Sequence, residues 1–319
     1  MNEKYSIWND VDMYRMGTID TSKEAIPTNS VFAVRQDETR EFEPRNETLS
    51  FNAMLQNLEN GTITQLDKKI LCILGTSRYA TIKQISELLT LIGETHFNDN
   101  ILTSIIKRLY KNGLICISRI VDQNGNKTSK IISLDKNGSE IAKKLGVVHV
   151  WNAFERVDEP WKLKTILCSN QLRNAYLKSG LPLQWFKLRA NLTIQGCIVK
   201  PSFATEISNV VFLFEVIRRK PLWQNSFAEK MSRYYSILKS IDDGEKNSWD
   251  ITSTPYIVVN GESFEHNLEI YNLLLTLNLD FGESLLFTED LLQFGEKFKR
   301  SLYTIKDTNG TAEYLQFDM

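Results

Sequence analysis

Between residues 61 and 147 the apolar positions first follow a helical period and then a strand-like one. Thr64 precedes the first amphipathic run and Thr81 precedes the second, each at the position of an N-cap, where a hydroxyl oxygen accepts from an unpaired backbone N–H. A third run spans residues 101–112 and is followed by Gly113, a typical residue at the end of a helix. This pattern predicts three consecutive short helices.

Two β-rich stretches follow these helices, at residues 114–121 and 128–134. The polar turn between them, 122–127, contains an Asn-Gly pair, which is a strong signal for a tight β-hairpin. A further short helix is expected at residues 139–145. Three helices followed by a hairpin are the pattern of a winged helix-turn-helix, so we predict this fold for residues 61–147.

The second half of the chain opens with a helical run at residues 161–179 and continues with several β-prone runs. The most apolar of them, 210–217, indicates a buried strand. Helical and strand-like runs then alternate: helix 225–240, strand 254–259, helix 263–277 and strand 283–288. The expected class is therefore α+β or α/β, with a mixed sheet after the winged helix.

Two motifs in this half resemble the restriction-endonuclease-like fold, the PD-(D/E)xK architecture. In that fold an Asp after a Pro and an acidic-x-Lys sequence on the next strand hold a divalent metal that activates water. Pro201 matches the Pro, but Ser202 stands in place of the Asp. Glu215 matches the acidic position, but Ile217 replaces the Lys. We therefore expect a nuclease-like domain that is catalytically degenerate.

A metal-dependent DNA nuclease stays open as an alternative. In that case Glu206 would supply a second carboxylate beside Glu215, and Lys230 from the following helix would replace the missing Lys. This alternative requires Mg²⁺ as a cofactor; without it, no cofactor and no metal site are expected.

The distribution of charge changes what the total suggests. The 319 residues carry a formal net charge of −1, which by itself argues against nucleic-acid binding. Residues 1–60 carry a net −5, residues 61–150 a net +6 and residues 151–319 a net −2. A local excess of Lys and Arg is what phosphate binding needs. We therefore expect the winged helix to bind double-stranded DNA, with protein contacts as the alternative use of this fold.

In a winged helix the third helix enters the major groove, and the wing touches the DNA backbone or the minor groove. Asn, Ser and Thr side chains can contact base edges, while Lys and Arg neutralise phosphates. The candidate contacts are Asn98, Asn100, Thr103, Ser104, Lys107, Arg108, Asn124, Asn126, Lys127 and Lys130. A second basic cluster, Arg218, Arg219 and Lys220, follows the buried strand and is expected to touch phosphate, unless it is only a solvated strand exit.

We expect three parts: an acidic N-terminal arm at residues 1–60, the winged helix at 61–147 and the nuclease-like domain at 148–319. The arm is irregular, with one strand expected at residues 30–34 and one short helix at 49–58. An acidic arm could also compete with DNA for the basic face of the winged helix.

Cysteine and histidine positions indicate the compartment. The four Cys and three His have no zinc-ligand spacing, which indicates free thiols in a reducing, cytoplasmic environment. The polar N-terminus does not resemble a signal peptide. No apolar run approaches the roughly 18 residues of a membrane span, so no membrane partner is expected.

The order of these segments resembles the replication-relaxation family of plasmid and mobile-element proteins. The resemblance covers roughly residues 62–306. It rests on the helical part with its Gly113-Leu114-Ile115 junction, the strand pair from Pro201 to Glu215, the helix motif around Lys230, and the strand 285–288 ahead of Leu291.

This resemblance implies a DNA-binding accessory protein for replication, relaxation or transfer of a plasmid or another mobile element. Other replication or transfer proteins would be its partners, and a homodimer is compatible with the role. A transcriptional regulator that dimerises through its second domain is a further alternative.

Overall fold

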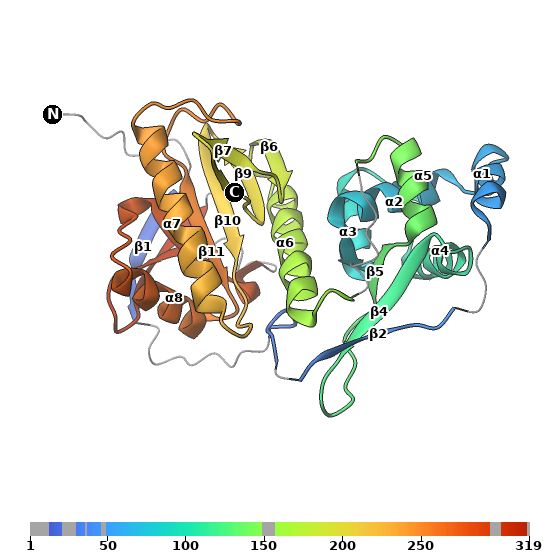
Figure 1. Ribbon diagram of the computed structural model, residues 1–319, viewed down its shortest axis with the longest axis horizontal. Helices are drawn as coiled ribbons and strands as arrows, with labels where there is room; N and C mark the ends of the chain where they lie inside the picture. Colours follow the sequence, from blue (N-terminus) through green and yellow to red (C-terminus); the bar gives the residue numbers. More distant parts are fainter. Residues whose placement is uncertain are drawn as a thin grey trace. The chain divides into compact units, whose positions relative to one another are not determined.

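The computed structural model describes residues 13–20, 30–35, 37–45, 49–148, 157–293 and 301–317, with the backbone alone described for 13–20, 316 and 317. The chain divides into two compact units. The N-terminal unit comprises Val34–Asn170, and the C-terminal unit comprises Gln171–Met319 together with Met1–Ala33. The division falls within the long helix α6 (Pro160–Lys178). Figure 1 shows the elements of both units.

Three helices form the centre of the N-terminal unit, as the sequence predicts. They are α2 (Gln65–Ser77), α3 (Ile82–Leu91) and α4 (Asp99–Lys111). Thr64 forms a reciprocal capping box with Asp67 at the start of α2, and Thr81 does the same with Gln84 at the start of α3. The side chain of Asn98 caps α4. Each helix therefore begins where a short polar side chain satisfies backbone N–H groups that have no partner within the helix.

The strands of this unit form an antiparallel sheet with the order β2-β4-β5-β3. They are β2 (Thr39–Phe42), β3 (Tyr79–Thr81), β4 (Ile115–Val121) and β5 (Ile131–Leu134). The pair β4 and β5 forms the expected hairpin. The strand β2 was not expected: it adds to the outer edge of β4, with Thr39 opposite Val121 and Phe42 opposite Ser118.

Two shorter helices, α1 (Phe51–Glu59) and α5 (Lys136–Lys144), complete the unit. Gly138 lets α5 begin close to the junction of α4 and β4, because a Cβ at this position would lie 1.8 Å from the carbonyl oxygen of Leu114. The core of the unit is aliphatic and fully buried, and it includes Ile70, Leu71, Leu74, Ile85, Leu89, Leu102 and Ile132.

An eight-stranded mixed sheet forms the C-terminal unit, in the order β1-β14-β13-β12-β11-β10-β9-β6. Its strands are β1 (Met13–Asp20), β6 (Leu183–Leu188), β9 (Phe203–Ile207), β10 (Val210–Val216), β11 (Tyr256–Gly261), β12 (Leu285–Glu289), β13 (Leu302–Ile305) and β14 (Thr311–Phe317). Neighbours are parallel between β10 and β11 and between β11 and β12, and antiparallel elsewhere. A separate hairpin, β7 (Leu192–Ile194) and β8 (Cys197–Val199), interrupts the chain between β6 and β9.

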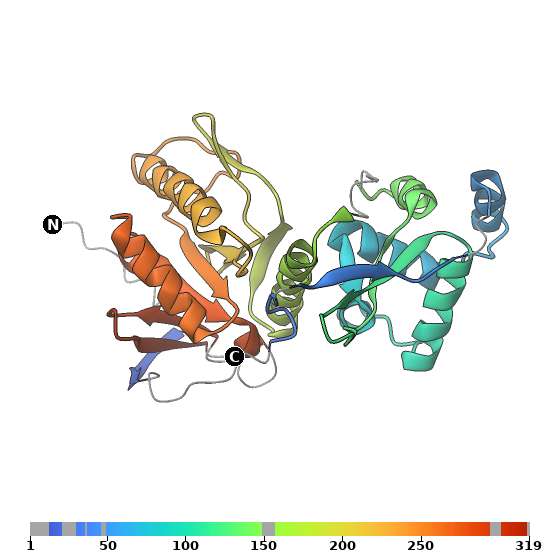
Figure 2. The ribbon, with the colours of Figure 1, turned by 60° about the horizontal axis from the view of Figure 1, so that its bottom comes forward.

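Helices cover both faces of this sheet. The helices α7 (Trp223–Asp242) and α8 (Phe264–Thr276) lie on one face, and the C-terminal part of α6 lies on the other (Figure 2). On the first face Met231 and Ile270 pack in one core with Leu213 of β10. On the second face the ring of Tyr176 lies edge-on to that of Phe214, with 4.9 Å between the ring centroids. Short 3₁₀ helices, Gly282–Ser284 and Asp290–Gln293, precede and follow β12.

The expected mixture of helices and strands is confirmed, but the boundaries of the two units differ from those expected at residues 60 and 147. Part of the expected arm belongs to the N-terminal unit because β2 pairs with β4, and another part belongs to the C-terminal unit because β1 pairs with β14. The helix expected at 49–58 is confirmed as α1. The strand expected at 30–34 is wrong, since these residues form a turn in which Ser30 donates a 2.5 Å hydrogen bond to Asp290.

Within the part of the chain that the structure describes, no helix combines the length and the apolar character that crossing a membrane requires.

Candidate functional site

The helix α4 has one buried apolar face and one exposed polar face. Its buried residues are Leu102, Ile105, Ile106 and Leu109. The opposite face carries the predicted contacts Asn100, Thr103, Ser104 and Lys107, and it continues to Lys111. All of these polar residues are exposed except Thr103, which is half-buried. The structure therefore brings four of the predicted residues into one stripe along the helix.

The lysines of this stripe are available to an external anion. Lys107 and Lys111 are exposed, and neither forms an ion pair with any residue that the structure describes. Lys111 was missed in the sequence, although its position four residues after Lys107 places it on the same face. Asn98 is exposed at the start of the stripe, but its side-chain oxygen accepts the N–H of Ile101 at 2.9 Å and so serves as the cap of α4.

Arg108, also predicted to contact DNA, has a structural contact instead. Its Nη2 donates to both carboxylate oxygens of Asp67, at 2.7 and 2.8 Å. Asp67 is buried and belongs to the capping box of α2, so this ion pair ties α4 to the first turn of α2. The prediction that Arg108 contacts DNA is therefore corrected. Its guanidinium binds Asp67 in another helix, and the sequence around Arg108 gives no sign of this partner.

Most of the predicted contacts in the hairpin are also engaged. Asn126 donates through Nδ2 to Asp122, and Asp122 accepts the backbone N–H groups of Asn124 and Asn126. These hydrogen bonds hold the pKa of Asp122 below its usual value. The side chains of Asn126 and Asp122 thus stabilise the turn itself.

The two lysines of the hairpin form ion pairs with the acidic residues in and after β2. Lys127 Nζ lies 2.9 Å from Glu41, and Lys130 Nζ lies 2.8 Å from Glu43. All four side chains are at least 29 % exposed. Pairs of this kind contribute little to stability but neutralise the charge of both partners.

The structure places the three members of the basic cluster after β10 in different surroundings. Arg218 is buried, and its Nη2 donates to Asp290 at 2.7 Å and to Asn260 at 3.3 Å. The prediction for Arg218 is therefore wrong, because β10 ends inside the unit among the ends of its parallel neighbours. Arg219 forms a 2.5 Å ion pair with Glu269, and Lys220 is half-buried.

A second group of polar residues surrounds Glu215, which is buried on β10. Lys230 Nζ lies 2.5 Å from its Oε1, and the hydroxyl of Tyr234 donates to its Oε2 at 3.0 Å. Burial and the adjacent Glu215 carboxylate raise the pKa of Tyr234 well above its usual value. The hydroxyl of Ser202 lies 3.4 Å from Glu215. The structure thus brings Ser202, Glu215 and Lys230 together, and the approach of Lys230 to Glu215 is the one that the nuclease alternative expects.

Glu206 does not join this group. It lies opposite Val211 in the pairing of β9 with β10, four residues beyond Ser202, and four residues along a strand span about 13 Å. The indole N–H of Trp185 donates to its carboxylate. The expectation that Glu206 supplies a second carboxylate to Glu215 is therefore wrong.

The residues around Glu215 do not fit a divalent-metal site. Ser202 is a weak ligand, and both oxygens of Glu215 already accept hydrogen bonds from Lys230 and Tyr234. Across the residues that the structure describes, no group of three or more His, Cys, Asp and Glu side chains could hold a metal ion.

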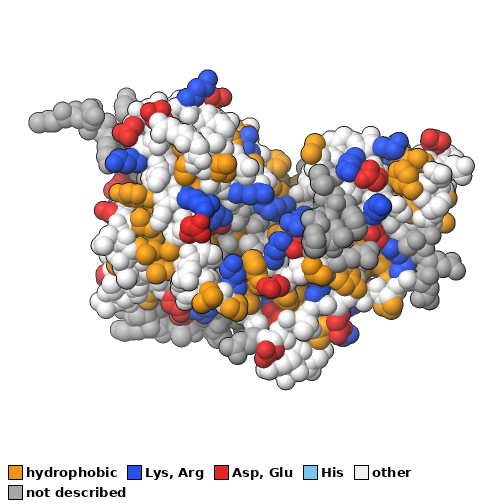
Figure 3. Space-filling model, in the orientation of Figure 1, with side chains coloured by type: hydrophobic (Ala, Val, Ile, Leu, Met, Phe, Trp, Pro, Cys, Tyr) orange, Lys and Arg blue, Asp and Glu red, His pale blue; other side chains and the backbone are white. Residues whose placement is uncertain are grey.

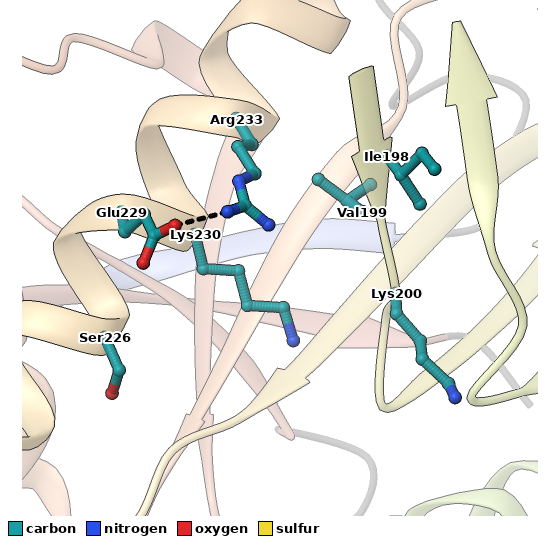
Figure 4. Close-up of a pocket in the computed structure, with 7 residues that line it drawn as sticks. All are labelled: Ile198, Val199, Lys200, Ser226, Glu229, Lys230 and Arg233. Atoms are coloured by element: carbon teal, nitrogen blue, oxygen red, sulfur yellow. Dashed lines mark hydrogen bonds and ion pairs between the residues drawn. The ribbon is translucent and has the colours of Figure 1, made fainter. Parts of the chain in front are cut away.

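A surface pocket of about 300 Å³ lies beside Lys230, between β8 and α7 (Figure 4). Its lining residues are Ile198, Val199, Lys200, Ser226, Glu229, Lys230 and Arg233. Arg233 forms an ion pair with Glu229, whereas exposed Lys200 has no ion-pair partner among the described residues. Figure 3 shows Lys and Arg side chains gathered on the face of this unit that carries α7, several of them beside Asp or Glu.

Sequence reasoning missed this pocket. The sequence does indicate the side of the pocket that a helix contributes. The spacing of its four residues places them on one face of that helix: Ser226, Glu229, Lys230 and Arg233. Nothing in the sequence indicates that Lys200, from the β7–β8 hairpin, lies across from that face.

Comparisons with known proteins add little. No family model matches the chain, and no curated protein matches it. Among solved structures, the crystal structure of protein VC1899 from Vibrio cholerae is similar with a TM-score of 0.26 and 10 % sequence identity. The match covers 80 % of this chain and 56 % of that one, so the chain spans about half the length of that protein. A TM-score this low supports no statement about fold or function.

Proposed function

We propose that this protein binds double-stranded DNA through a winged helix in its N-terminal unit, with α4 as the recognition helix. The observation that carries the proposal is the exposed polar stripe of α4, from Asn100 to Lys111. Asn, Ser and Thr in this stripe suit contacts to base edges, and the two lysines suit phosphates. A helix of 13 residues is about 20 Å long, which is enough to follow a major groove across several base pairs.

The topology of the unit supports this assignment. The chain order is α2, β3, α3, α4, β4, β5, and β3 pairs with β5 at the side of the hairpin. This order and pairing match the helix–strand–helix–helix–hairpin plan of a winged helix. In that plan the helix before the hairpin is the one presented to DNA, and here that helix is α4.

The C-terminal unit is proposed to be a nuclease-like fold without nuclease activity. Its order α6, β6, β9, β10, α7, β11 gives an antiparallel meander followed by a parallel crossover, the plan of the restriction-endonuclease-like core. Lys230 close to Glu215 favours the nuclease alternative, but the donor set there lacks a second carboxylate and Ile217 is buried in the core. We propose that the protein acts as an accessory factor in replication, relaxation or transfer of a mobile element, as the family resemblance implies.

Titration of labelled duplex DNA with the full chain tests DNA binding by α4. A plot of log affinity against log salt concentration has a negative slope, and each phosphate contact contributes about 0.9 to its magnitude. Replacing Lys107 and Lys111 together by Ala should therefore reduce the magnitude of this slope by about 1.8. The matched control is the double change Lys143→Ala and Lys144→Ala, which removes two exposed lysines of α5 in the same unit. Equal losses in both variants, or no loss in the α4 variant, would contradict the proposal.

A further inference from the structure

The pocket between β8 and α7 brings three basic side chains together from two separate elements. In Figure 4, Lys230 and Arg233 extend from α7 on one side and Lys200 extends from the end of β8 on the other. We propose that this pocket binds a phosphate group of a nucleic-acid strand, as a contact separate from α4.

The position of the Lys230 side chain is fixed by its contact with Glu215. Glu215 is buried, and Lys230 Nζ lies 2.5 Å from its Oε1 while Tyr234 holds the other oxygen at 3.0 Å. An ammonium group has three N–H donors, so this pair leaves donors of Lys230 for a ligand. Glu215 and Tyr234 are thus positioning residues, because they orient Lys230 without lining the pocket.

The charge balance of the site favours one monoanion. Arg233 is paired with Glu229 and Lys230 with Glu215, whereas Lys200 is exposed and has no ion-pair partner among the described residues. The site therefore holds one more cation than carboxylates. A phosphodiester carries a single negative charge and would neutralise this excess. Guanidinium and ammonium groups are also the side-chain groups that commonly bind phosphate oxygens, and the paired Arg233 and Lys230 keep further N–H donors.

The apolar part of the pocket favours a nucleotide unit over a bare phosphate ion. Ile198 is 47 % exposed in the pocket wall and offers a surface for a sugar or a base. Ser226 does not serve as a donor, because its hydroxyl proton is directed to the carbonyl oxygen of Trp223 at 3.0 Å. The ligand is therefore held by the three cations and by apolar contact.

The test uses the full chain carrying Lys107→Ala and Lys111→Ala, so that binding through α4 is reduced, and a labelled single-stranded oligothymidylate as the probe. The further changes Lys200→Ala and Arg233→Ala should weaken binding about tenfold, since hydrogen bonds to charged groups are among the stronger ones. Their control is Lys239→Ala, which removes an exposed lysine of α7 outside the pocket. Thermal unfolding checks that every variant folds. Lys230 is left in place because its loss would leave Glu215 buried and unpaired.

Two competitors distinguish the sources of phosphate. Unlabelled oligothymidylate should displace the probe at far lower phosphate concentration than inorganic phosphate does. Equal competition by inorganic phosphate would overturn the assignment to a nucleic-acid strand. Equal affinity of the pocket variant and the Lys239→Ala control would overturn the pocket itself, whatever the outcome for duplex binding by α4.

Discussion

Two stretches of basic residues look alike in the sequence and have opposite surroundings in the structure. Lys107 on α4 is exposed and has no ion-pair partner among the described residues. Arg218, two residues after the end of β10, has a side chain that is 1 % exposed and is paired with Asp290. The first can meet a ligand, and the second holds strand ends together. Charge along the chain therefore indicates a binding surface only when the position of each side chain relative to the core is known.

The difference has a geometric cause. On an amphipathic helix the apolar positions mark the buried face, so the exposed face follows from the period. In a fully buried strand the apolar and polar residues do not alternate, so the sequence does not show which way the residues after the strand point. The direction of Arg218 depends on Asp290, 72 residues further along the chain, and this partner leaves no local signal.

Breaking the buried pair should have the largest effect. We expect Arg218→Ala or Asp290→Ala to lower the free energy of unfolding by about 3–5 kcal/mol, because each leaves an uncompensated buried charge. Arg219→Ala is the matched control, and it should cost less than about 1 kcal/mol because its pair with Glu269 is partly exposed to solvent. Urea denaturation measures both. Similar losses in the two variants would contradict the contrast between the buried arginine and the partly exposed one.

The pH dependence of stability sharpens the same comparison, because His266 lies buried near both arginines. Burial, Arg219 and Arg218 lower the pKa of His266 to about 3. The unfolded chain binds this proton near pH 6.5, whereas the folded chain does not. Stability from this residue is therefore complete above about pH 6.5 and is lost as the pH falls toward 3, by up to about 1.4 kcal/mol per pH unit.

Chemical denaturation at pH 7 and pH 5 tests this prediction. The change His266→Gln should remove most of the difference between the two pH values, whereas His96→Gln, at an exposed position, should leave it in place. A pH dependence that survives in His266→Gln would show that other groups are responsible.

The hairpin offers a smaller test, because its lysines are paired where those of α4 are not. Replacing Glu41 and Glu43 together by Gln frees Lys127 and Lys130, so duplex affinity at low salt should rise by roughly threefold or more, and the salt dependence should steepen. The control Glu59→Gln with Glu140→Gln removes two carboxylates elsewhere in this unit, exposed Glu59 and half-buried Glu140, which is paired with Lys143. An equal gain in the control would mean that only total charge matters.

Local structure was predictable where capping or turn residues mark the ends of a helix or strand. Thr64 and Thr81 mark two helix starts, and the Asn-Gly turn marks the hairpin between β4 and β5. The approach of Lys230 to Glu215 agrees with the nuclease alternative, which places Lys230 on the helix after the strand of Glu215. These predictions depend on short-range patterns or on strands that adjoin in the chain.

Contacts between distant segments could not be predicted. The pairing of β2 with β4 joins residues about 80 positions apart, and the partner of Arg108 lies in another helix. The nuclease alternative expects Glu206 to supply a second carboxylate beside Glu215, but the register of β9 with β10 separates them. Register and tertiary pairing, not residue type, determine which side chains meet.

The strand β2 has one more consequence, for self-association. It covers the outer edge of β4, a seven-residue strand rich in Ile and Val whose free backbone groups would otherwise face outward. An open edge of this kind is a template for strands of other molecules, whereas a four-residue edge strand that bears Arg40 and Glu41 is a poor one. The strand β2 therefore replaces the long apolar edge of β4 by a short charged one, and we expect a shortened chain beginning at residue 49 to associate with its own copies more readily.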